Sequence, residues 1–409
     1  MFKIFIPSLI HIIITYLLNL YGIQLFPESI IIVYFITSLF FLNEKKDFFV
    51  IFLIGYIIRI MLMYFDIYFN DVFVLPHTGD ANSFYEAGKI YYNYGSIFLS
   101  DIYGGLYSKF LGFIMLLTGE NRLILQHLNI IFDIGSIIIL IRCLQLLDIK
   151  NKIIKIVILI YTFMPMHMII ASVLMRESII VYLISLSLIN IINYYKNNKN
   201  KYLVEAFTFI ILGSLFHSAV IFLGTGYLYI ILFNKSNINF KKILNILILL
   251  FLLISIVYIN RDIVFKKLLI DGEVNISYGN YKGADSIYLP QLKINNIREA
   301  IIYSPIRGLY FLISPTPFYW RGIVDVLSFM LDSSIYIIFI MESIRVLKNR
   351  EIVLNNKVIV LGLLLSIFVF TIIFGLGVNN SGTAIRHRNK ILILVLTFIA
   401  CVYNDRLLS

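Results

Sequence analysis

The sequence predicts an all-α polytopic membrane protein with about twelve transmembrane helices and two sizeable loops on the outer face. Of its 409 residues, 60% are hydrophobic and only 14% are charged. Apolar runs recur along the chain, and such runs cross membranes as helices because a helix satisfies its own backbone hydrogen bonds. The Lys and Arg residues stand in short clusters between these runs, which is typical of cytoplasmic loops.

The first apolar run, at the N-terminus, is expected to be retained as a span. It lacks the small-residue cleavage pattern of a signal peptide, and a second run follows at once. The predicted spans are 3–22, 26–42, 48–68, 123–147, 152–173, 178–194, 203–216, 219–233, 243–259, 323–346, 358–378 and 390–404.

The Lys/Arg-rich connections fix the orientation of these spans. Placing all of them in the cytoplasm also places both termini there. The clusters are 43–47, 148–155, 196–201, 234–242 and 345–357. We therefore expect residues 1–409 to form a single integral-membrane domain.

Three outer parts follow from this orientation: a first loop at 69–122, a long loop at 260–322, and the short loop "NNSGTAIRHR". Segment 104–119 is apolar but short, and a further span there would invert the charge pattern downstream. We interpret it as a re-entrant or interfacial helix on the outer face.

Two other classes of protein are disfavoured by the composition. The net charge of +11 suggests nucleic acid, but the basic residues serve as topology signals, so we expect no nucleic-acid partner. Cys143 and Cys401 lie inside apolar runs, so no disulfide framework is indicated. We expect neither a bound metal nor a cofactor.

Arg386, His387 and Arg388 stand in the short outer loop, against the usual charge bias. An unfavourable placement suggests an anionic ligand. The alternative is that these residues only cap the last helix at the membrane interface.

Other charged residues gather on the same predicted face. Arg176 and Glu177 lie at the outer end of two spans, where they could serve a site or simply pair with each other. His217 lies at another outer turn, where a hydrogen-bonded structural role is the alternative. Arg307 and Arg321 flank a Pro-broken apolar stretch.

The first outer loop carries Asp80 and Tyr85 after a Gly turn, at the start of a predicted amphipathic helix. Asp80 is either a functional carboxylate or a helix cap. Within the next span, Gln126, Asn129 and Asp133 share one face. Such a stripe either joins helices or lines a site.

Several arginines at one membrane face suit a lipid diphosphate, because the guanidinium fork matches phosphate oxygens. A lipid-linked saccharide is then a good donor, since its developing negative charge is stabilised. The acceptor hydroxyl needs a base, for which Asp80, Glu177 and His217 are the candidates. This chemistry is glycosyl transfer from a polyprenyl-diphosphate saccharide.

In "LMRESII", "LFHSAVIF" and "GTAIRHRNK", with weaker support from "LNIIFDIGSIIIL", the chain resembles the bacterial polymerases that join lipid-linked O-antigen or capsule repeat units. These are GT-C type glycosyltransferases of the cytoplasmic membrane, active at its outer face in building lipopolysaccharide or capsule. The resemblance implies that Arg176, Arg386 and Arg388 hold the donor diphosphate. It also implies partners: the polyprenyl-diphosphate oligosaccharide, the bilayer and a chain-length regulator.

The stretch "HTGDANSFYEAG" departs from those polymerases and resembles lipid-carrier-dependent sugar transferases, in which an Asp of this loop is the base. That resemblance assigns the base to Asp80 and leaves open whether one sugar or a repeat unit moves. We expect Arg307, Arg321, His387 and Tyr85 to contact the saccharide or the acceptor. A transporter or flippase of lipid-linked saccharides is a third possibility, but the two halves show no internal repeat.

Overall fold

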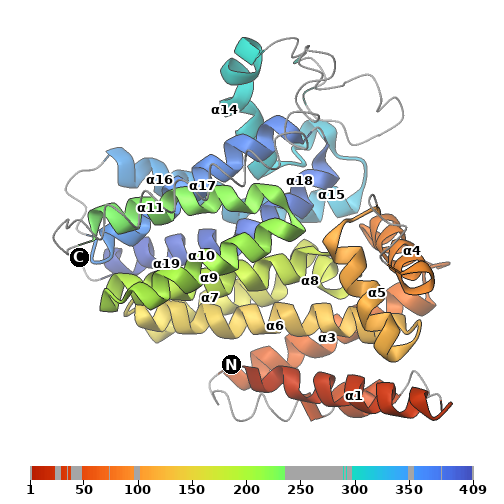
Figure 1. Cartoon of the computed structure of the whole chain (residues 1–409). Coiled ribbons are helices and arrows are strands. Elements are labelled where there is room, and N and C mark those ends of the chain that lie inside the picture. The colour runs from red at the N-terminus through yellow and green to blue at the C-terminus, as the bar shows by residue number, and fades with distance from the viewer. Residues whose placement is uncertain are drawn as a thin grey trace. The chain divides into compact units, whose positions relative to one another are not determined.

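The computed structural model describes residues 2–23, 29–34, 36–37, 48–72, 74–95, 102–234, 289, 292, 297–348, 354–378 and 380–407. All regular elements in these ranges are helices (Figure 1). The predicted all-α class is therefore confirmed for the part of the chain that the structure describes.

The chain divides into two compact units, which are described separately. The first unit comprises Met1–Arg142 and Ile154–Ser185, and the second comprises Cys143–Ile153 and Leu186–Ser409. In chain order the main helices are α1 (Ile6–Leu20), α3 (Phe49–Tyr68), α4 (Thr78–Tyr94), α5 (Leu106–Thr118), α6 (Arg122–Leu146), α7 (Asn151–Phe163), α8 (Pro165–Ser172), α9 (Glu177–Asn197), α10 (Asn200–Phe216), α11 (Gly224–Phe233), α14 (Ile297–Ile313), α15 (Ile323–Leu327), α16 (Ser334–Lys348), α17 (Lys357–Gly377), α18 (Ser381–Arg388) and α19 (Leu392–Arg406).

Five stretches of helix in the described ranges are long and apolar enough to cross a membrane, and a bent pair raises the number to six. They are α3, α6, α9, α17 and the stretch Ile323–Lys348. These bounds lie close to the predicted spans, because long apolar runs leave the helix as the only way to satisfy the backbone in lipid. Twelve spans remain a prediction. The predicted span 243–259 and most of 26–42 lie outside the described residues.

The predicted continuous span 152–173 is in fact two helices. α7 and α8 are bent by 57° where one ends and the other begins. Pro165 explains the break, because proline has no N–H to donate and its ring clashes with the preceding turn. Met164 is accordingly extended, with ψ 116°.

In the first unit, α4 and α5 lie side by side (Figure 1). α4 is the helix expected in the first outer loop, but it begins at Thr78. Gly79 therefore lies within its first turn, and the turn predicted at this glycine falls at His77, whose φ is 71°. α5 has 13 residues, which gives it a length of about 20 Å, less than the hydrocarbon thickness of a bilayer. Its assignment as a re-entrant or interfacial helix stays a prediction.

In the second unit, α17 packs against both α11 and α14 (Figure 1). α14 occupies 297–313, part of the stretch predicted as the long outer loop. Residues 297–313 of that stretch are therefore helical, and the following residues up to 322 include only the short 3-10 helix Pro317–Tyr319. Residues 260–288 of the same predicted loop lie outside the described ranges.

Candidate functional site

A buried carboxylate near the end of α3 organises the surrounding part of the first unit. Asp66 accepts hydrogen bonds from Thr78 Oγ1 at 2.8 Å, Arg122 Nη2 at 2.8 Å and Gln126 Nε2 at 2.7 Å. Its donors come from α4 and α6, so one side chain ties three helices together. A buried carboxylate needs such charged and polar partners, because desolvation without them is costly.

The start of α4 is held by the hydrogen bond between Thr78 and Asp66. His77 takes the N-cap position with φ 71°, and Thr78 begins the helix. Asp80 therefore lies inside the first turn and is not the N-cap residue. Negative charge is stabilised there by the helix dipole. Its Oδ1 accepts a hydrogen bond from Tyr103 at 3.2 Å, and the side chain is partly exposed.

Phe84 connects Asp80 to a second predicted site residue. Phe84 lies one helical turn after Asp80 on the same face, and its ring is 5.1 Å from that of Tyr103. Arg176 lies with its guanidinium carbon 5.7 Å from the centroid of the Phe84 ring. A carboxylate and a guanidinium thus flank one aromatic pair. We call Asp80, Phe84, Tyr103 and Arg176 the Asp80–Arg176 cluster.

Hydrogen bonds from α6 hold the turn that carries Arg176. The Asn129 amide donates to the carbonyls of Val173 at 3.1 Å and Met175 at 2.7 Å. The next residue, Glu177, is buried at 1% exposure and starts α9. The backbone of the turn that leads into Arg176 is therefore held by α6.

Tyr85 faces the other side of α4, towards the turn before α6. Its hydroxyl donates to the Glu120 carbonyl at 3.3 Å, and Arg122 lies 5.5 Å from its ring. Burial raises the pKa of the Tyr85 phenol, so it stays a hydrogen-bond donor. The Glu120 carboxylate, 3.3 Å from Lys89, raises the pKa of that ammonium group. Tyr85 is outside the Asp80–Arg176 cluster.

In the second unit, two motifs that are far apart in the sequence meet. The His217 ring lies 4.9 Å from that of His387 and 5.1 Å from that of Phe374. Lys390 donates to His387 Nδ1, and its ammonium lies 5.6 Å from the Phe374 ring. We call His217, Phe374, His387 and Lys390 the histidine cluster. It joins the "FHSA" turn to the "RHRNK" segment.

Arg307 and Arg388 are bonded to main-chain carbonyls at helix ends. Arg307 Nε donates to Gly375 at 2.9 Å and its Nη2 to Val378 at 2.9 Å, at the end of α17. Arg388 Nη1 donates to Leu312 at 2.8 Å and also to Ser314, at the end of α14. The last carbonyls of a helix lack intrahelical partners, so both guanidinium groups act as caps here.

The remaining predicted residues of the second unit have separate places. Arg321 makes a forked pair with Asp325, at 2.7 and 2.8 Å. Arg386 is buried within α18. The binding roles predicted for these arginines stay predictions.

A polar network deeper in the first unit contains residues that the sequence interpretation missed. Asp133 bonds Arg59 Nε at 2.8 Å, His167 Nε2 at 2.8 Å and Tyr161 at 3.1 Å. Arg59 Nη1 also donates to the Thr162 carbonyl at 3.0 Å, beside the break between α7 and α8. Each member of the predicted stripe Gln126, Asn129 and Asp133 thus joins helices or turns.

A usable signal for these residues existed in the sequence. Arg59 and Asp66 are charged residues inside a predicted span, and such residues mark buried partners or sites by default. Tyr103 and Phe84 gave no signal, because aromatic residues are abundant along the chain. Within the described ranges, no three His, Cys, Asp or Glu side chains lie close enough together to hold a metal ion.

Comparisons with protein-family models, with curated proteins and with solved structures find no significant match for this chain.

Proposed function

We propose that the protein is a membrane glycosyltransferase that takes its sugar from a polyprenyl-diphosphate-linked saccharide at the outer membrane face. Asp80 removes the proton from the acceptor hydroxyl as that oxygen attacks the anomeric carbon of the donor. The bond from this carbon to the diphosphate oxygen breaks, and polyprenyl diphosphate leaves with the bonding electron pair. Arg176 holds the diphosphate and stabilises the charge that develops on it.

The Asp80–Arg176 cluster is the observation that carries this proposal. In it, Tyr103 bonds the partly exposed Asp80 carboxylate and packs against Phe84, and Phe84 in turn contacts the Arg176 guanidinium. Tyr103 donates to Asp80, so the carboxylate is oriented. Arg307 and Arg388 support the proposal less, since their guanidinium groups already bond backbone carbonyls.

Polymerisation of repeat units is the second candidate within the same chemistry. The histidine cluster favours it, because it unites the two motifs on which the resemblance to repeat-unit polymerases rests. The resemblance of the Asp80 segment to lipid-carrier-dependent sugar transferases favours transfer of a single sugar.

The proposal is tested by Asp80→Asn and Arg176→Lys in cells whose own copy is deleted. Loss of a general base is expected to slow transfer by about 10²–10⁴-fold. Lysine keeps the charge of Arg176 but loses the fork, so we expect at least about a tenfold loss. Glu86→Gln, an exposed carboxylate on the same helix, and Arg298→Lys, an exposed arginine of α14, are the matched controls.

The readout is surface polysaccharide together with lipid-linked intermediates, at equal membrane levels of each variant. Single repeat units without long chains identify a polymerase. Repeat units that lack one sugar identify a single-sugar transferase. Normal polysaccharide and normal intermediates in Asp80→Asn would contradict the proposed function.

A further inference from the structure

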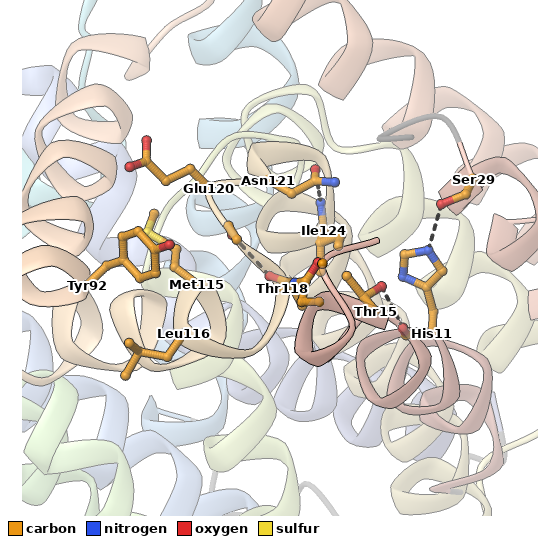
Figure 2. A pocket seen from close by; sticks show the side chains of 13 residues that line it. His11, Thr15, Ser29, Tyr92, Met115, Leu116, Thr118, Glu120, Asn121 and Ile124 are labelled. Carbon is orange, nitrogen blue, oxygen red and sulfur yellow. Dashed lines mark hydrogen bonds between the residues drawn. The ribbon is translucent and has the colours of Figure 1, made fainter. Parts of the chain in front are cut away.

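A polar cavity of about 450 Å³ lies in the first unit, between α1, the end of α4, and the turn from α5 into α6. Figure 2 shows Tyr92, Met115 and Leu116 on one side of it and His11 and Ser29 on the other. The volume is within the range of small-molecule sites. Tyr92 is twelve residues beyond Asp80, or about 18 Å along α4, so the cavity is separate from the Asp80–Arg176 cluster.

Neutral hydrogen-bonding groups dominate the cavity wall. They are the hydroxyls of Thr15, Ser29 and Thr118 and the amides of Asn19 and Asn121. The Thr15 and Thr118 hydroxyls donate to the carbonyls of His11 at 2.8 Å and Ile114 at 3.0 Å, so they serve a ligand as acceptors, and the amides supply N–H donors. Ser29 also shares a hydrogen bond of 3.1 Å with His11 Nε2. A wall of this kind matches a ligand that is itself rich in hydroxyl groups.

The charge of the lining argues against an anionic occupant. Among the described residues that line the cavity there is no lysine or arginine, and Glu120 is the one that carries a charge. A phosphate or diphosphate would meet this carboxylate without a cation to compensate. Tyr92, Met115 and Leu116 supply an apolar side, which suits the C–H face of a sugar ring.

We propose that this cavity binds a neutral, hydroxyl-rich saccharide portion of the lipid-linked substrate, away from the reacting sugar. This inference rests on the proposed function and names a subsite for it. The remote contact would hold donor or acceptor equally in the ground state and the transition state. It would therefore act on KM more than on kcat.

Protection of an introduced cysteine tests the inference. Asn19→Cys places a thiol in the cavity wall. Leu116→Cys, at an exposed part of the rim, is the alternative single variant if Asn19→Cys folds poorly. Both native cysteines, Cys143 and Cys401, are buried, so a water-soluble maleimide is expected to react mainly with the introduced thiol. Lys201→Cys, on an exposed turn of α10, is the control.

The probe is the polyprenyl-diphosphate saccharide fraction extracted from membranes of cells that lack the protein. We expect this fraction, and the saccharide released from it by mild acid, to slow labelling in the cavity at least about fivefold and to leave Lys201→Cys unaffected. Sugar-free polyprenyl diphosphate should give no protection. Equal protection by the sugar-free lipid, or no protection by any fraction, would overturn the inference.

Failure of the subsite is distinguishable from failure of the proposed function. Asp80→Asn lies outside the cavity, so the same protection is expected when it is added to the cysteine variants. Full transfer by Asp80→Asn contradicts the proposed function whatever the labelling shows. Absent protection, with transfer still dependent on Asp80, removes only the subsite.

Discussion

The buried guanidinium of Arg388 bonds main-chain carbonyls at the end of a helix. It is exposed by 1% and bonds the carbonyls of Leu312 and Ser314. The Tyr336 ring lies 5.1 Å from its guanidinium carbon, and the Tyr336 hydroxyl bonds the Arg388 carbonyl at 3.0 Å. These contacts cap the last turn of α14 and join it to α16.

We predict that Arg388→Lys destabilises the protein more than it slows transfer. Lysine cannot reproduce the forked donors, so at least one charged hydrogen bond to a helix end is lost, at about 1–3 kcal/mol. Thermal unfolding in detergent measures the stability, and Arg298→Lys is the exposed control. A normal unfolding midpoint combined with severe loss of transfer would instead support the diphosphate role predicted from the sequence.

Individual candidate residues could be predicted from the sequence, but the residues that they contact could not. Asp80 and Arg176 could be selected, because one stands in a short turn motif and the other at the end of an apolar run. Phe84, which contacts Arg176 and packs against Tyr103, could not be selected as a site residue, since it is one of 34 phenylalanines. The hydrogen bonds of Asp66 join α3 to α4 and α6. A local sequence pattern cannot show which separate helices come into contact.

At the scale of elements, α11 and α17 approach each other closely in the second unit. A Cβ atom added at Gly226 would lie 1.9 Å from the Gly362 carbonyl oxygen. Small residues that let backbones approach are typical of helix pairs in membranes, where packing and not hydrophobic burial drives association. The pair Gly226 and Gly362 therefore sets the distance between these helices.

We predict that Gly226→Ala destabilises the protein by at least about 2 kcal/mol, because the clash is with backbone that no rotamer change relieves. Gly377→Ala, in α17 where an added Cβ has no heavy atom within 4 Å, is the control. Unfolding midpoints in detergent report both variants. Equal midpoints for Gly226→Ala and the wild type would show that α11 and α17 do not approach this closely.

Helix bounds could be predicted closely where the apolar run was long and uninterrupted. The predicted spans 48–68 and 358–378 correspond to α3 and α17 within one residue at each end. The break inside 152–173 was missed because hydropathy does not register a lost N–H. Pro165 was the available signal, and Arg59 bonds the Thr162 carbonyl beside the break.

For the whole molecule, hydropathy and charge predicted a helical chain with membrane-spanning segments but could not predict the division into two units. The unit boundaries fall inside α6, α7 and α9, where the apolar pattern continues without change. Such a boundary depends on which helices pack together. It does not need a linker, and no Pro- or Gly-rich stretch marks it in the sequence.

Membrane orientation is the prediction on which the proposed chemistry depends most. The Lys/Arg-rich connections place residue 201 in the cytoplasm and residues 83 and 383 outside. We therefore predict that Ser83→Cys and Thr383→Cys react with a membrane-impermeant maleimide in intact cells. Lys201→Cys should react only after the membrane is opened.

Because the native Cys143 and Cys401 are buried, the labelling of each variant reports one site. Ser83 lies three residues from Asp80 on α4, so its label also gives the side of the proposed base. Labelling of Lys201→Cys in intact cells, with Ser83→Cys protected, would move the Asp80–Arg176 cluster to the cytoplasmic face. There a nucleotide sugar, and not a lipid-linked saccharide on the outer face, would be the accessible donor, and the choice of polyprenyl diphosphate would lose its physical basis.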